Sequence, residues 1–70
     1  MTADPDDRVL VYRERLAYAR ADLLDALELW ADAEIDGDLR REAHTWELVE
    51  ANRRMVLHER EMLEAAIHGR

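Results

Sequence analysis

Residues that break helices occur at only three places in this 70-residue chain. The only proline is Pro5, and the only glycines are Gly37 and Gly69. Proline disrupts a helix interior and glycine costs about 1 kcal/mol there, so both tend to mark where helices begin and end. The stretches between them are rich in Ala, Leu, Glu and Arg, which are strong helix formers. The pattern predicts two long helices, over about 5–35 and about 39–68.

The junction at 36–38 has the residues that end one helix and begin another. Gly37 suits a left-handed C-cap, and Asp38 suits the N-cap of the second helix. A connection this short forces the two helices to lie antiparallel. The predicted fold class is therefore all-α: a coiled-coil-like, two-helix antiparallel hairpin that forms a single domain over 1–70.

Apolar residues occupy more of each predicted helix than one neighbouring helix can cover. At about 100° per residue, they fill roughly half of each cylinder or more. An apolar flank on a soluble protein usually marks an interface, and most oligomers are twofold homodimers. We therefore predict a dimer that forms a four-helix bundle, with Trp30 and Trp46 packed near the turn. The expected core and dimer positions are Leu16, Leu23, Leu27, Trp30, Leu48, Met55 and Met62.

Four polar residues interrupt these apolar arcs at heptad spacing. Arg13 and Arg20 do so in the first predicted helix, and Asn52 and Glu59 in the second. A buried Asn or an Arg–Glu pair commonly fixes register and oligomeric state while lowering stability. We interpret the four residues as candidates for setting the register. The alternative is that the arcs are narrower and these residues lie at their edges.

A second apolar row lies away from the main stripe of the first predicted helix. It consists of Val11, Tyr18 and Leu29, with Asp22 and Asp25 on the same side. Apolar residues set among acids suit the docking of a basic and hydrophobic partner protein, with Tyr18 as the anchor. Isolated apolar residues are also normal on protein surfaces, so ordinary surface is the alternative.

The segment DAEIDGDLRREA, residues 32–43, follows part of the pattern of a calcium-binding loop. Its acids alternate, and Gly37 stands at the sixth position. Such a loop is closed by a bidentate Glu at its twelfth position. That position is Ala43, and Glu42 is one residue early, which on a helix is a rotation of about 100°. We therefore interpret the segment as a capped turn, for which Asp and Gly are the expected residues.

Residues suited to catalysis or metal binding are scarce. The chain has no Cys and no Ser, so a nucleophile paired with a base has little material to be built from. No histidine stands three residues after a Glu, which is the motif of carboxylate metal bundles. We expect a protein that is not an enzyme, with no catalytic residue, no metal site and no cofactor.

The net charge of −7 arises from 17 acids and 10 basic residues, all of them Arg. Phosphate repels an acidic surface, so we expect no direct nucleic-acid binding. The chain is also too charged for a membrane span. Its acidic start and lack of Cys favour a cytoplasmic protein. The exclusive use of Arg and the abundant Ala are typical of a GC-rich bacterial or phage genome.

These features predict a small acidic helical module for protein–protein interaction. We expect an adaptor or regulator that acts as a homo-oligomer and binds an unidentified protein. One alternative is an acidic inhibitor that mimics DNA, because residues 1–35 carry a net charge of −5 from nine acids and four Arg. Another alternative is a structural assembly subunit that uses both apolar flanks.

Overall fold

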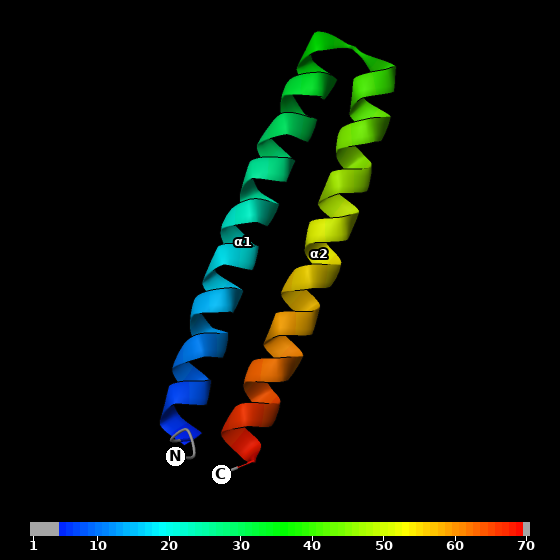
Figure 1. Ribbon diagram of the computed structural model, residues 1–70. Helices are drawn as coiled ribbons and strands as arrows, with labels where there is room; N and C mark the ends of the chain where they lie inside the picture. The colour runs from blue at the N-terminus through cyan, green and yellow to red at the C-terminus, as the bar shows by residue number, and fades with distance from the viewer. Residues whose placement is uncertain (1–4, 70) are drawn as a thin grey trace.

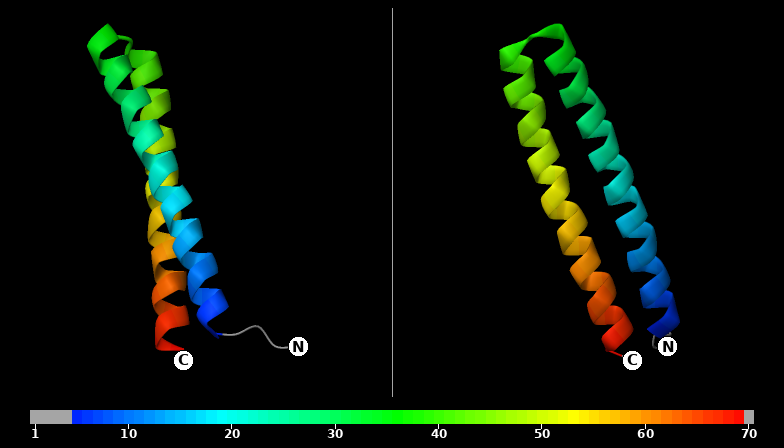
Figure 2. Two further views of the ribbon diagram at one scale, coloured as in Figure 1. Left: turned by 90° about the vertical axis from the view of Figure 1, so that its left-hand side faces the viewer. Right: turned by 180° about the vertical axis from the view of Figure 1, so that it is seen from behind.

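The computed structural model describes residues 5–69, which form two helices joined by a tight turn (Figure 1). Helix α1 spans Pro5–Asp36 and helix α2 spans Leu39–His68, so the predicted boundaries are confirmed to within one residue. The helices lie side by side in Figure 1 and in the right-hand view of Figure 2, and the chain runs along them in opposite directions. The predicted all-α antiparallel hairpin is therefore confirmed.

The turn satisfies backbone groups at the end of α1 and at the start of α2. Gly37 has a φ of 69°, in the left-handed region that favours glycine. Its N–H donates to the Glu34 carbonyl at 3.1 Å, and the Asp38 N–H donates to the Ala33 carbonyl at 3.2 Å, which together form a Schellman motif. The Asp38 side chain then accepts a hydrogen bond from the Arg41 N–H at 3.0 Å. The predicted C-cap and N-cap are both confirmed.

The hairpin is a rod of 54 × 16 × 13 Å. Its radius of gyration is 16.0 Å, whereas a compact domain of this length has about 11 Å. Its accessible surface is 5683 Å², against about 4,500 Å² for a compact protein of 8.2 kDa. Two helices can cover only one stripe on each other, so much of each cylinder remains in contact with solvent.

The two helices meet along one stripe of each, which we call the seam. Buried and half-buried residues recur at alternating intervals of three and four, the heptad pattern of a coiled coil. The seam consists of Val9, Tyr12, Leu16, Ala19, Leu23, Ala26, Trp30 and Ala33 of α1, and of Glu42, Thr45, Val49, Asn52, Val56, Glu59, Leu63 and Ala66 of α2.

Small and polar side chains occupy many seam positions. Ala33 is completely buried, and Ala19, Ala26 and Thr45 are almost so. The Thr45 hydroxyl donates to the Arg41 carbonyl of its own helix at 2.8 Å, which satisfies this buried polar group. Alanine at the contact lets two helices approach closely, but it buries little apolar surface. The seam therefore holds the hairpin with modest side-chain burial.

The seven predicted core and dimer positions divide between the seam and the surface beside it. Leu16, Leu23 and Trp30 lie in the seam, where Leu16 is buried. The other four lie outside the seam: Leu27, Leu48 and Met55, which are exposed, and Met62, which is half-buried. The hairpin by itself therefore does not cover the second group.

Candidate interaction surface

Two surfaces border the seam, one on each broad side of the hairpin. Because the helices are antiparallel, equivalent heptad positions of α1 and α2 lie on the same side. We name the two sides flank A and flank B. Flank A consists of Arg8, Val11, Arg15, Tyr18, Asp22, Asp25, Leu29 and Asp32 of α1, and of Arg41, His44, Leu48, Ala51, Met55, His58, Met62 and Ala65 of α2. Flank B consists of Leu10, Arg13, Ala17, Arg20, Leu24, Leu27, Ala31 and Glu34 of α1, and of Leu39, Ala43, Trp46, Glu50, Arg53, Leu57, Arg60, Glu64 and Ile67 of α2.

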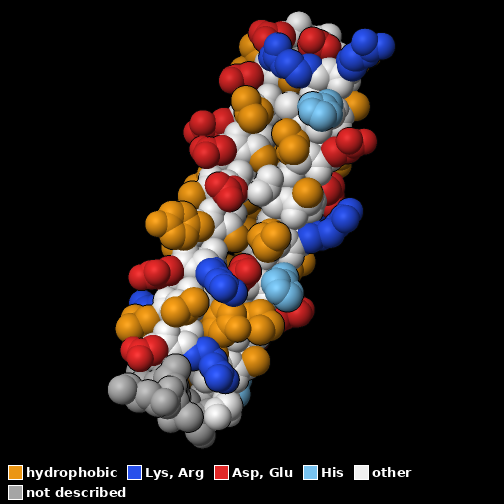
Figure 3. Space-filling model, viewed as in Figure 1, with side chains coloured by type: hydrophobic (Ala, Val, Ile, Leu, Met, Phe, Trp, Pro, Cys, Tyr) orange, Lys and Arg blue, Asp and Glu red, His pale blue; other side chains and the backbone are white. Residues whose placement is uncertain are grey.

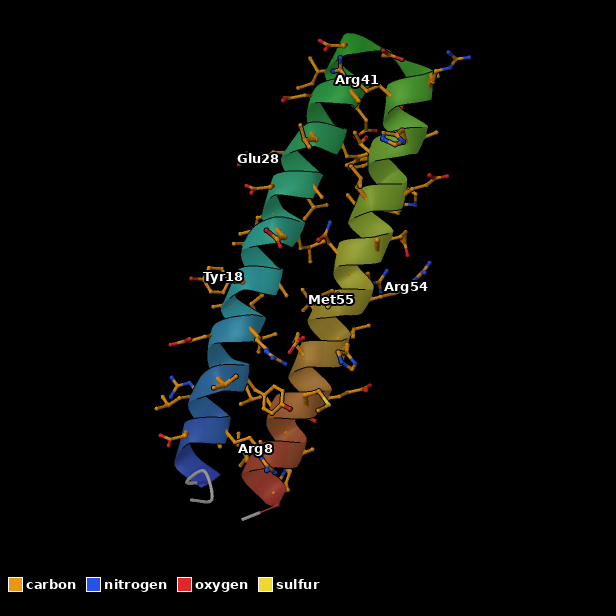
Figure 4. All side chains as sticks on the ribbon, in the orientation of Figure 1. Arg8, Tyr18, Glu28, Arg41, Arg54 and Met55 are labelled. Carbon is orange, nitrogen blue, oxygen red and sulfur yellow. The ribbon has the colours of Figure 1, made fainter. Side chains whose placement is uncertain are left out.

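Flank A carries large apolar side chains from both helices. Tyr18 is 74% exposed and projects from the edge of α1, and Met55 is 51% exposed on α2 (Figure 4). Val11, Leu29 and Leu48 are also exposed. In the space-filling view, apolar groups alternate with charged ones along the length of the rod (Figure 3). Flank A is thus a long mixed surface rather than a single apolar patch.

The residues predicted to dock a partner all lie on the α1 half of flank A. Val11, Tyr18 and Leu29 are exposed, as expected for a docking surface. Asp22 and Asp25 lie between them and take part in none of the salt bridges of residues 5–69. Their function in docking stays a prediction.

Sequence reasoning did not place Leu48 and Met55 on the same side as Tyr18. Each side of a hairpin combines one face of α1 with one face of α2. The residue pattern of a single helix does not show which face of the second helix lies on the same side. The alanines at 19, 26 and 33 carried a signal, because their exact seven-residue spacing is that of a seam. Once that seam is fixed, the two flanks follow from helical geometry.

Flank B has an aromatic cluster near the turn. The rings of Trp30, in the seam, and Trp46, beside it, have centroids 5.1 Å apart and planes inclined at 52°. Tilted aromatic pairs at this distance are favourable. Together with Leu39, Glu42 and Ala43 they line an open hollow of about 350 Å³. The predicted packing of the two tryptophans near the turn is confirmed.

Among the described residues, none of the four candidate register residues forms a hydrogen bond or salt bridge across the seam. The Asn52 side chain donates to the Leu48 carbonyl of its own helix at 2.8 Å. One carboxylate oxygen of Glu59 is buried without a hydrogen-bond partner. Arg13 and Arg20 are exposed on flank B, and no salt bridge of the described residues joins either of them to Glu59. Their function in setting the register stays a prediction.

The acids of the junction contact arginine and backbone groups. Asp36 forms an ion pair with Arg41 at 2.6 Å, and this hydrogen bond holds the pKa of Arg41 above its usual value. Asp38 caps α2, as described above. Within residues 5–69, no group of three or more His, Asp or Glu side chains is arranged to hold a metal ion.

Neither of the two described helices has a stretch apolar enough to cross a bilayer. Comparison with models of known protein families, with curated proteins and with solved structures gave no match. The surface of the hairpin therefore supplies the basis for a functional proposal.

Proposed function

We propose that this protein is a small helical module for protein–protein interaction that acts as a homo-oligomer. One observation carries the proposal: the large apolar side chains lie mostly on the flanks, whereas small and polar residues fill much of the seam. Thirteen large apolar residues of the described part of the chain are exposed. The well-buried residues are Val9, Leu16, Ala19, Ala26, Ala33, Thr45 and Val49.

The free energy of burial supports association. Full burial of one large aliphatic or aromatic side chain contributes about 1.5–3 kcal/mol. A chain of 70 residues that leaves thirteen of them exposed forgoes much of this stabilisation. A second hairpin can cover a flank along its whole length, since both are rods of the same size. Small domains often gain stability in this way.

Two flanks give such a module two surfaces. If a second copy covers one flank, the other remains available to a different protein, which is the arrangement of an adaptor or regulator. A structural assembly subunit is the second candidate, favoured by the presence of apolar residues on both sides. A subunit with two self-adhesive sides would add further copies rather than stop at a dimer.

Sedimentation equilibrium over a range of micromolar concentrations tests the proposal. We expect the mass of two chains of 8.2 kDa each, with no further growth as the concentration rises. Growth without limit would favour the assembly subunit instead. A mass of one chain at every concentration would contradict the proposal.

A further inference from the structure

We infer that flank A is the self-association surface, and that a second copy packs on it in the reverse direction, with its turn beside the open end of the first copy. In this dimer α1 lies against α1 of the second copy, and α2 against α2. The inference rests on the proposed homo-oligomeric function and adds the face, the orientation and the contacting pairs.

Flank A has the length and spacing that such an interface needs. Its α1 residues run from Arg8 to Asp32 at alternating intervals of three and four, so α1 carries a second heptad stripe beside the seam. The broad side of the rod measures 54 by 16 Å, about 860 Å² in projection. A stable interface buries about 800 Å² on each partner. One flank is therefore large enough.

The charges on the α1 half of flank A are separated by sign. Arg8 and Arg15 lie in the half near the open end, and Asp22, Asp25 and Asp32 lie in the half near the turn. Among the side chains that the structure describes, those of residues 7–69, none of these five takes part in a salt bridge. Two copies of α1 laid together in opposite directions bring the arginines of each against the aspartates of the other.

One register makes every α1 pair chemically complementary. In this register, residue i of one α1 lies opposite about residue 40 − i of the other. The two α1 helices then overlap along nearly their whole length. The pairs are Arg8 with Asp32, Arg15 with Asp25, Val11 with Leu29, and Tyr18 with Asp22. Arginine and aspartate form charge-assisted hydrogen bonds, and a tyrosine hydroxyl can donate to a carboxylate. The twofold axis repeats each pair.

Arg15 is already held near the position that this pairing requires. Its guanidinium lies over the ring of Tyr12, 5.4 Å from the ring centroid. Tyr12 is a seam residue, so the ring fixes the arginine close to the boundary between the seam and flank A. A partly ordered side chain loses less conformational entropy when it pairs.

The same register brings apolar residues together on α2. Within one hairpin, the seam places residue i of α1 opposite about residue 75 − i of α2, as for Ala33 and Glu42. Combined with the α1 register above, this places residue j of one α2 opposite about residue 110 − j of the α2 of the second copy. Met55 then lies at the twofold axis near Met55 of the second copy, and Leu48 lies near Met62 of the second copy. These residues are apolar, and methionine adapts readily to an irregular interface.

The same reversed arrangement on flank B, and a flank A dimer with the turns together, leave charges without partners. In the two heptad registers of flank B nearest to full overlap, Arg13 and Arg20 would face only Leu24, Ala17 or Ala31. Burial of an unpaired charge is strongly unfavourable. If copies joined through flank A with their turns together, α1 would face α2 of the second copy. Asp22 and Asp25 would then face Ala51 and Met55.

Charge exchange between two variants tests the pairing. We expect Arg15→Asp and Asp25→Arg each to raise the dimer dissociation constant at least about tenfold, because each places like charges together at two symmetric sites. An equimolar mixture should form a heterodimer of near wild-type affinity, because every contact is again an Arg–Asp pair. The control Arg54→Asp, an exposed arginine outside the seam and both flanks, should change the dissociation constant by less than about twofold. Helicity measured by circular dichroism shows that each variant folds.

Crosslinking tests the orientation independently. The chain has no native cysteine, so Met55→Cys provides a single thiol at the expected twofold axis. Mild oxidation should join two such chains, because disulfides form only between closely approaching Cβ atoms. The matched variant Leu57→Cys, on flank B, should remain largely uncrosslinked.

The outcomes separate this inference from the proposed function. A dimer that crosslinks through Leu57→Cys and not through Met55→Cys overturns the inference and leaves the homo-oligomer intact. A dimer that is indifferent to Arg15→Asp, or a variant mixture that stays dissociated, overturns the pairing in the same way. A wild-type chain that sediments as a monomer at every concentration overturns both.

Discussion

The α2 side of the seam is packed more tightly near the turn than toward the open end of the hairpin. Near the turn, Ala26, Ala33, Thr45 and Val49 are all at most 5% exposed. Thr45 and Val49 are also the only buried residues within Leu39–His68. Toward the open end, the α2 side of the seam is only half-buried, and it includes Glu59 with its unpaired oxygen. The α1 side stays buried there at Val9, Leu16 and Ala19.

This difference shows that proximity to the turn compensates for a weak seam. Residues close to the turn meet after a short loop closes, which costs little chain entropy. Residues far from the turn need stronger side-chain contacts, and the α2 side of the seam is less buried there. In the inferred dimer the turn end of each copy lies beside the open end of the other, so association would stabilise the less buried part of each α2.

The largest expected effect comes from Trp30→Ala. We expect a loss of about 3 kcal/mol in the free energy of unfolding, because the variant removes a large seam side chain and its contact with Trp46. Urea unfolding followed by circular dichroism at one protein concentration measures this. Tyr12→Ala, at the open end of the seam, is the matched variant and should lose less. An equal loss for both would contradict the comparison of the two ends.

Overpacking should separate the two ends by a smaller amount. Ala33→Leu introduces three carbons at a site with no exposed surface, so we expect a loss of about 2 kcal/mol. Ala66→Leu makes the same change at a half-buried seam position of the open end, where the added carbons can find room. We expect its melting temperature to stay near the wild-type value. A larger fall for Ala66→Leu than for Ala33→Leu would show that the open end is the tighter one.

The smallest effect should be a gain of stability. Glu59→Met removes a buried carboxylate oxygen that has no partner, and we expect the free energy of unfolding to rise by about 1 kcal/mol. Glu61→Met, on the exposed surface of the same helix, is the control and should leave stability nearly unchanged. If Glu59→Met destabilises the protein, then the carboxylate makes a favourable interaction, such as the register contact predicted from the sequence.

The helices and their turn could be predicted because their signals are local. Pro5 and Gly37 fix where α1 begins and ends, and Asp38 begins α2. The Trp30–Trp46 contact could be predicted because residues near a short turn have little freedom of register. These predictions need no knowledge of how the rest of the two helices pack.

The seam could not be predicted, because each helix presents several stripes with the same spacing. Size and hydrophobicity favoured Leu48 and Met55 as core or dimer residues, and within the hairpin itself the seam is formed by Thr45 and Asn52. The choice depends on how the small residues of α1, such as Ala33, let α2 approach. For the same reason, the sequence showed that Tyr18 and its neighbours lie apart from the main stripe but not which residues of α2 lie beside them.

The tilted tryptophan pair has an optical consequence. Two indole transitions held 5.1 Å apart at 52° couple to one another, and the coupling disappears as soon as the rings separate. These are the only tryptophans of the chain, so no other indole obscures the signal. The loss of that coupled band reports separation of the helices at the turn, whereas the peptide bands report loss of helix. The wild-type protein can thus distinguish opening of its hairpin from melting of its helices without an added dye.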